Sequence, residues 1–149
     1  MITIPKSIVD RMITHSKKEY PHECCGLLSG QNGKISYIYE IENDDQSPDT
    51  YFMNPKELLD AQKDIREKSL ELIGIYHSHT HSNAYPSKTD IEKSFWPESD
   101  LPLFPKSLYF IISLQDLNKP VIKVFDIKKG QIEEKQFKIV NLNQKGGQM

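Results

Sequence analysis

Apolar residues recur at helical spacing in three segments of the chain. Residues 5–20 and 54–72 each carry apolar side chains every three to four positions, which predicts an amphipathic helix in each segment. Pro5 suits the first turn of the first helix, because proline lacks the N–H that would otherwise lie unpaired there. A short third helix is predicted over 87–95, with Ser87 as its N-cap.

Runs of continuous or alternating apolar residues lie between these segments and predict strands. The predicted strands cover 24–30, 34–41, 72–79, 107–114, 121–127 and 132–140. The turn at Lys129-Gly130 predicts that the last two of these strands pair with each other. This order predicts an α/β fold: a single-domain three-layer α-β-α sandwich with a mixed sheet over 1–140, followed by a flexible C-terminal tail over 141–149.

Composition narrows the class of protein. A chain of 149 residues with 37% hydrophobic residues can bury a core of its own, and a net charge of −2 gives no reason to expect nucleic acid or an acidic membrane as partner. We find no signal peptide and no apolar run of transmembrane length, which favours a cytoplasmic protein. The adjacent Cys24 and Cys25 are expected to be reduced thiols.

The stretch GIYHSHTHSNAYPSKTD, residues 74–90, carries the candidate chemistry. On a strand His77 and His79 point to the same face, and His81 falls where a loop has begun. Asp90 lies in the first turn of the following helix, close enough for the loop to bring it back over the strand end. Two imidazoles and one carboxylate leave the fourth position of a zinc ion open, as in catalytic zinc sites.

The spacing of these residues resembles a known motif. His77-Ser78-His79, then seven residues, then Ser87, two residues and Asp90 is similar to the JAMM motif of the MPN (Mov34/PAD-1) metalloprotease family. The PSKTD ending is similar to that of the short prokaryotic members.

A second segment carries the same resemblance. PHECCGLLSG, residues 21–30, is similar to the family's upstream Pro-x-Glu-x-Cys-Gly-x-Leu-x-Gly segment, with Glu23 at the position of its glutamate. The resemblance extends from the first predicted helix to about Leu114. One departure is Thr80, where many members have proline, and this position holds no ligand.

The resemblance implies a role for each matching residue. His77, His79 and Asp90 would bind one Zn²⁺ ion per chain. Glu23 would take a proton from the attacking water and pass it to the leaving amine, and Ser87 would donate a hydrogen bond to the developing oxyanion. The implied fold is the MPN fold, which is related to that of cytidine deaminases.

The resemblance also implies a substrate class. Members of the family act on peptide or isopeptide bonds at the C-terminus of ubiquitin-like proteins or of sulfur-carrier proteins, whose tails end in Gly-Gly. The chain is short and has little room for substrate-clamping insertions, so a sulfur carrier is favoured. The residue released, the identity of the carrier and the presence of a homodimer stay open, as do the roles of Cys24, His81 and the chain's own Gly146-Gly147 pair.

The sequence disfavours three alternatives to a peptidase. A non-catalytic MPN scaffold is disfavoured because every expected ligand is present. A PHP-type metal phosphoesterase, suggested by the HTHS run, would need further histidines, and none follows His81. A zinc deaminase would need a Pro-Cys-x-x-Cys pair, which the sequence lacks.

Overall fold

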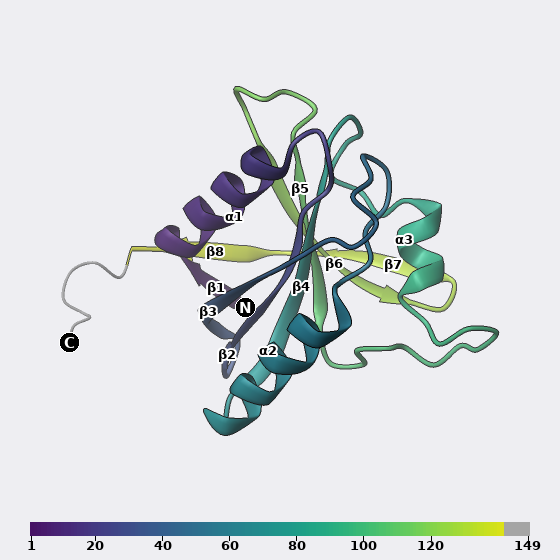
Figure 1. Cartoon of the computed structure of the whole chain (residues 1–149). Coiled ribbons are helices and arrows are strands. Elements are labelled where there is room, and N and C mark those ends of the chain that lie inside the picture. Colours follow the sequence, from purple (N-terminus) through teal and green to yellow (C-terminus); the bar gives the residue numbers. More distant parts are fainter. Residues whose placement is uncertain (142–149) are drawn as a thin grey trace.

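A computed structural model describes residues 1–141 of the chain and shows one α/β domain built on a mixed sheet (Figure 1). The elements are β1 (Ile2–Pro5), α1 (Lys6–Glu19), β2 (Cys25–Gln31), β3 (Lys34–Ile41), α2 (Pro55–Glu67), β4 (Glu71–His79), α3 (Lys88–Lys93), β5 (Leu108–Ser113), β6 (Val121–Lys128), β7 (Gln131–Lys135) and β8 (Phe137–Val140). Except for Asn141, the predicted tail and its Gly146-Gly147 pair lie outside the described residues.

The strand order is β7-β6-β5-β4-β2-β3-β1-β8. Three neighbouring pairs run parallel, namely β4 with β5, β1 with β3 and β1 with β8, and the other pairs run antiparallel. The prediction of a mixed sheet is therefore confirmed. No helix within residues 1–141 is long and apolar enough to cross a membrane.

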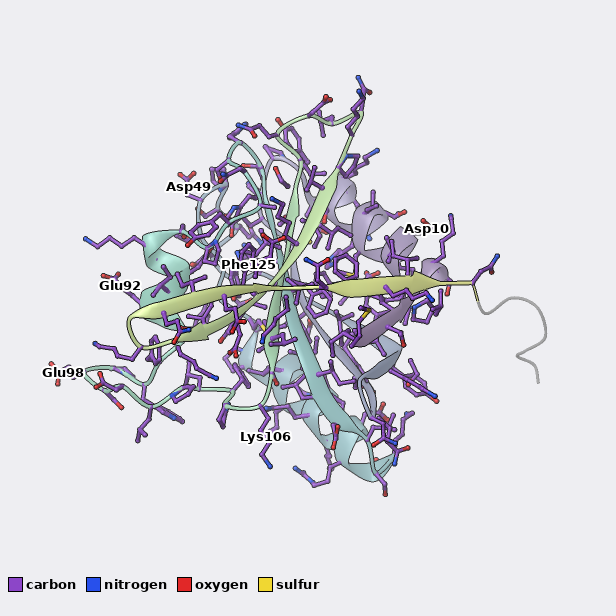
Figure 2. All side chains as sticks on the ribbon, turned by 180° about the vertical axis from the view of Figure 1, so that it is seen from behind. Asp10, Asp49, Glu92, Glu98, Lys106 and Phe125 are labelled. Atoms are coloured by element: carbon purple, nitrogen blue, oxygen red, sulfur yellow. The ribbon has the colours of Figure 1, made fainter. Side chains whose placement is uncertain are left out.

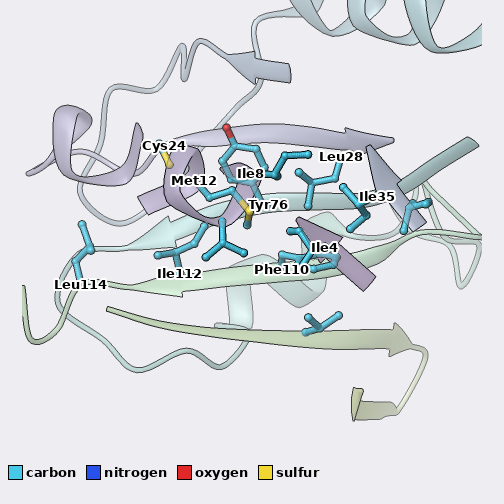
Figure 3. Packing of buried hydrophobic residues seen from close by; sticks show 13 residues of the cluster. Ile4, Ile8, Met12, Cys24, Leu28, Ile35, Tyr76, Phe110, Ile112 and Leu114 are labelled. Carbon is cyan, nitrogen blue, oxygen red and sulfur yellow. The ribbon is translucent and has the colours of Figure 1, made fainter. Parts of the chain in front are cut away.

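Helices cover both faces of the sheet, as the three-layer prediction requires. Helix α1 packs Ile8, Val9 and Met12 onto one face, against the buried rings of Tyr76 and Phe110 (Figure 3). Each such apolar side chain contributes about 1.5–3 kcal/mol when it leaves water completely.

The opposite face is covered by α2 and, beside it, by the region of α3. Helix α2 buries Ala61 and Ile65 against a second cluster that includes Ile75, Ile111 and Phe125. Because side chains alternate along β4, this is also the face on which His77 and His79 lie.

The start of the chain differs from the prediction. Pro5 does not begin the first helix but is the last residue of β1, in an extended conformation, and α1 begins at Lys6. Strand β1 was not predicted, because only Ile2–Pro5 form it and proline is rare inside strands. It is held mainly by a parallel pairing with β8, far away in the sequence.

The second helix is shorter than predicted. It ends at Glu67, and Ser69 then adopts a positive φ of 58° that turns the chain into β4. Leu72 therefore belongs to a strand and not to the apolar face of a helix. Helical spacing continued past the true end because the apolar residues of β4 fell by chance on the same stripe.

The predicted strand over 132–140 is wrong, since two strands occupy this segment. Residues of β7 pair with β6 at one end of the sheet, and residues of β8 pair with β1 at the other end. Only Gln136 separates them, so the sheet must curl until its two ends meet. Figure 2, which views the molecule from behind, shows the resulting long ribbon crossing in front of the rest of the sheet. Phe137 of β8 packs against Phe110 of β5, with ring centroids 6.2 Å apart.

The curled sheet places the end of β4 in its middle. Strand β4 lies between β2 and β5, with Cys25 and Ile111 as the pairing partners of His77. Gly26 is needed beside this position, because a Cβ atom there would collide with the ring of Tyr76 and with the carbonyl oxygen of Tyr39. The histidines thus project from a fully hydrogen-bonded, rigid strand.

Candidate metal centre

The structure brings three predicted ligands together at the end of β4. The Nε2 atoms of His77 and His79 lie 3.2 Å apart. Oδ2 of Asp90, from the first turn of α3, lies 3.0 Å from Nε2 of His77 and 2.9 Å from Nε2 of His79. All three side chains are nearly inaccessible to solvent.

These separations fit a metal ion. Ligand atoms about 2.0–2.1 Å from a tetrahedral zinc ion lie roughly 3.3 Å from one another. The three atoms lie slightly closer together than that, and a small outward movement of each would admit the ion. The three residues can therefore hold a metal ion, with one coordination position left for a ligand from outside the protein.

The two imidazoles are oriented in different ways. Nδ1–H of His79 donates to the carbonyl oxygen of Asn83 at 2.8 Å, which directs Nε2 toward Asp90. His77 has no such bond, and its buried Nδ1 has no partner among residues 1–141. Its ring instead stacks on Tyr51, with centroids 4.6 Å apart and planes 27° from parallel. Tyr51 was missed in the sequence because it lies far from the motif and follows no pattern with it.

The start of α3 fixes Asp90. The backbone N–H of Asp90 donates to Oγ of Ser87 at 3.0 Å, and the backbone N–H of Ser87 donates to Oδ2 of Asp90 at 2.9 Å. This capping box confirms Ser87 as the N-cap. Because Oγ acts here as an acceptor, its hydrogen remains available for another acceptor.

Asp90 and the imidazole of His79 influence each other's pKa values. Burial acts to raise the pKa of Asp90, but His77, His79 and the amide of Ser87 outweigh it and hold that pKa well below its usual range. Burial likewise acts to lower the pKa of His79, and the hydrogen bonds that its ring donates to Asp90 and to the carbonyl oxygen of Asn83 raise this pKa overall. Asp90 is therefore a permanent anion at the centre of the site.

Glu23 lies directly before β2 and beside this group. Cys25 pairs with His77, so the same register continued by two residues places Glu23 opposite His79. The Glu23 side chain is buried, and its Oε1 has no hydrogen-bond partner in the part of the chain that the structure describes. A buried carboxylate oxygen without a partner is costly, and it indicates a polar ligand that the protein atoms alone do not supply.

Burial raises the pKa of Glu23 to about 8, and the neighbouring charges of Asp90 and Asp49 add to this while His79 opposes it. A divalent cation held by the neighbouring group would lower this pKa again, because it favours the ionised carboxylate. Protonation of Glu23 and the binding of metal are thus coupled by charge.

Comparison with known proteins identifies the family of the chain. Residues 5–126 match the model of the family described as prokaryotic homologs of the JAB domain. The chain belongs to this family. Within the JAB-domain match lie Glu23, His77, His79, Ser87 and Asp90.

Named relatives of this JAB-domain protein include peptidases. It is 26% identical over 142 residues to the CysO-cysteine peptidase of Mycobacterium tuberculosis (strain H37Rv), covering 94% of this chain and 92% of the relative. It is 34% identical over 98 residues to the desampylase of Pyrococcus furiosus, covering 65% of this chain and 70% of that one. A Desulfitobacterium hafniense protein of known solution structure superposes with a TM-score of 0.80, at 36% identity and over 95% and 94% of the two chains.

Two residues of the JAB domain whose roles the sequence left open lie outside the metal group. Cys24 is buried with its Sγ 3.3 Å from Oγ of Ser16, and burial raises the pKa of its thiol to about 11. A thiol of this kind is a packing residue and not a nucleophile. His81 is exposed and contacts the ring edge of Tyr20, with centroids 6.0 Å apart.

An apolar groove leads away from the metal group. It is a hollow of about 570 Å³ between α2 and the segment that follows α3. Tyr51, which stacks on His77, forms its inner end. The walls include Met53, Leu58, Phe95, Pro97, Leu103 and Phe104. The groove therefore adjoins the metal group through Tyr51.

Proposed function

We propose that the protein is a zinc metallopeptidase that hydrolyses a peptide or isopeptide bond at the C-terminus of a ubiquitin-like or sulfur-carrier protein. One observation carries the proposal: the His77–His79–Asp90 group lies beside a buried Glu23 oxygen that has no hydrogen-bond partner within residues 1–141. The similarity to a CysO-cysteine peptidase and to a desampylase supports the substrate class.

His77, His79 and Asp90 would hold the zinc ion, since two imidazoles and a carboxylate form a common catalytic zinc donor set. Zinc there supplies a Lewis acid and makes water a far stronger acid than it is in bulk. Glu23 accepts the proton of the attacking water at its free Oε1 and then delivers it to the leaving amine nitrogen. Ser87 donates its Oγ hydrogen to the carbonyl oxygen as negative charge develops there.

The groove supports an extended substrate. A tail lying along the apolar walls would come next to the metal group at Tyr51, the lining residue that stacks on His77. Glycine residues just before the cleaved bond would let the backbone approach the site closely, because they have no Cβ atom. A C-terminal Gly-Gly tail fits both requirements.

Cleavage is expected to depend on these glycines. A carrier protein extended past Gly-Gly should be cut by the zinc-loaded enzyme directly after the second glycine, as read by intact mass. Replacing both glycines by alanine should lower kcat/KM by more than about tenfold, which is a loss of about 1.4 kcal/mol of transition-state stabilisation. An unchanged rate with the Ala-Ala tail would contradict the proposed tail specificity. A zinc-loaded protein that cleaves no carrier at all would favour a non-catalytic scaffold.

Ser87→Ala is expected to lower kcat by about 10²-fold if the hydroxyl stabilises the oxyanion. It should also lower stability by about 1 kcal/mol, because the N-cap is lost. Ser87→Thr keeps the hydroxyl in both roles and should retain most of the activity. Steady-state kinetics and thermal unfolding separate the two effects: a fall in stability with unchanged kcat in Ser87→Ala would leave Ser87 as a helix cap only.

A further inference from the structure

The segment between β3 and α2, residues 42–54, folds into a closed loop. Its two arms pair in an antiparallel bridge between Asn43 and Met53, and the N–H of Asp44 donates to the carbonyl oxygen of Phe52 at 2.8 Å. In the structure the loop packs directly against the residues that precede β2.

The side chain of Asn43 lies at the centre of this loop and is 8% exposed. Its Oδ1 accepts the backbone N–H groups of Asp45 and Phe52 at 3.0 and 2.9 Å. Its Nδ2 donates to the carbonyl oxygens of Glu23 and Thr50 at 3.0 and 3.1 Å. The amide thus uses both donors and two acceptor positions, and only one of the four bonds leaves the loop, to Glu23.

Glu23 depends on this loop for its position. Strand β2 begins only after Cys24, and β4 holds the peptide group between Glu23 and Cys24 through one bond, from the N–H of Cys24 to Oγ of Ser78 at 2.8 Å. The N–H of Glu23 donates to the carbonyl oxygen of Ser47 at 2.8 Å, and its carbonyl oxygen accepts the bond from Asn43. Because Oε1 of its side chain has no partner among the described residues, the direction of the carboxylate follows from where the backbone is held.

The same loop also forms one wall of the apolar groove. Tyr51 and Met53 line the groove, and the N–H of the intervening Phe52 is one of the groups bound by Asn43. The Asn43 amide therefore connects the backbone of Glu23 to this groove wall. The wall includes Tyr51, whose ring stacks on His77.

We propose that Asn43 is a positioning residue that holds the general base and the groove wall as one rigid unit. This inference rests on the proposed function for the role of Glu23 in turnover. Catalytic groups need support of this kind, since a displacement of about 1 Å can lower the rate on the order of 10²-fold. Asn43 contacts neither the substrate nor the metal ligands, and it acts through Glu23.

The test is Asn43→Asp, which keeps the size of the side chain and the acceptor Oδ1. It removes both N–H donors and places a carboxylate oxygen against the carbonyl oxygens of Glu23 and Thr50. The amide hydrogen of Glu23 should exchange with solvent at least about tenfold faster than in the wild type, as expected when its local structure opens more often. kcat should fall on the order of 10²-fold with little change in KM or zinc content.

Asn54→Asp is the matched control, with the same chemical change at the outer end of the same loop. Asn54 caps α2 by accepting the N–H of Glu57, which aspartate does equally well, and its amide donates only to the exposed Asp44. This control should match the wild type in both Glu23 exchange and kcat. If Asn43→Asp does not fold, Asn43→Ser removes the same two donors without adding charge, and the same results are expected of it.

A double-mutant cycle separates positioning from a general structural role. In a Glu23→Gln background, Asn43→Asp should lower the residual turnover no further, because the group through which it acts is already gone. Two results would overturn the inference. One is a double mutant whose turnover is lowered by the product of the two separate factors, and the other is an amide hydrogen exchange rate of Glu23 that is the same in Asn43→Asp as in the wild type. A wild-type enzyme that cleaves no carrier would refute the proposed function instead, while the exchange measurement, which needs no substrate, would still decide the role of Asn43.

Discussion

Replacement of Glu23 by glutamine is expected to lower turnover by about 10²–10⁴-fold while fold and metal content stay those of the wild type. The amide has nearly the same shape as the carboxylate, but it cannot accept a proton. Glu23 is the buried acid beside the metal group and has a carboxylate oxygen free for the attacking water. Intact-mass kinetics on a Gly-Gly carrier, zinc analysis and thermal unfolding measure the three quantities on the same preparation.

The matched control is Glu134→Gln, the same change at an exposed position of β7. It should leave turnover unaltered, which shows that the loss in Glu23→Gln does not arise from one negative charge fewer on the protein. Wild-type turnover in Glu23→Gln would remove Glu23 from the mechanism.

Replacement of His77 by alanine is expected to abolish both zinc retention and activity. Its Nε2 is one of three ligand atoms in the group, and its removal leaves only His79 and Asp90, too few for tight binding of zinc. The purified wild type should carry about one zinc ion per chain. After treatment with a chelator, added zinc should restore the activity of the wild type but not that of His77→Ala.

His81→Ala provides the comparison, because His81 is exposed and lies outside the group. Metal analysis should find the same zinc content in this variant as in the wild type. If His81→Ala lost zinc as completely as His77→Ala, the assignment of ligands would be wrong.

Local rules made the grouping of His77, His79 and Asp90 predictable. Alternation along a strand places the two histidines on one face, and a serine N-cap places the third residue of the helix next to it. The stacking of Tyr51 on His77 and the bonds of Asn43 to Glu23 obey no such rule. They depend on how the 42–54 loop packs in three dimensions, and loop packing leaves no periodic signal in a sequence.

The strands also divide into those that local sequence patterns predict and those that depend on long-range pairing. Strands β2, β4 and β5 are visible as apolar runs because their residues fill the core, and β3 and β6 are visible as shorter or alternating apolar patterns. The boundary between β7 and β8 leaves no sign in the sequence, because Gln136 is neither a glycine nor a proline that would mark a turn. Only the neighbouring strand changes at this residue, from β6 to β1. Likewise, an apolar stripe cannot show that α2 ends at Glu67, where the turn at Ser69 begins.

The pairing of β1 with β8 has a consequence for synthesis on the ribosome. Strand β1 pairs with β3 through Thr3 and Lys34 alone, whereas it pairs with β8 at four positions, from Ile2 with Phe137 to Pro5 with Val140. At an elongation rate of about 5–20 residues per second, β1 waits roughly 7–27 s until β8 has been made. During that time the edge of β1 that β8 will occupy has no partner strand. The sheet is therefore completed only after β8 has been synthesised and has paired with β1.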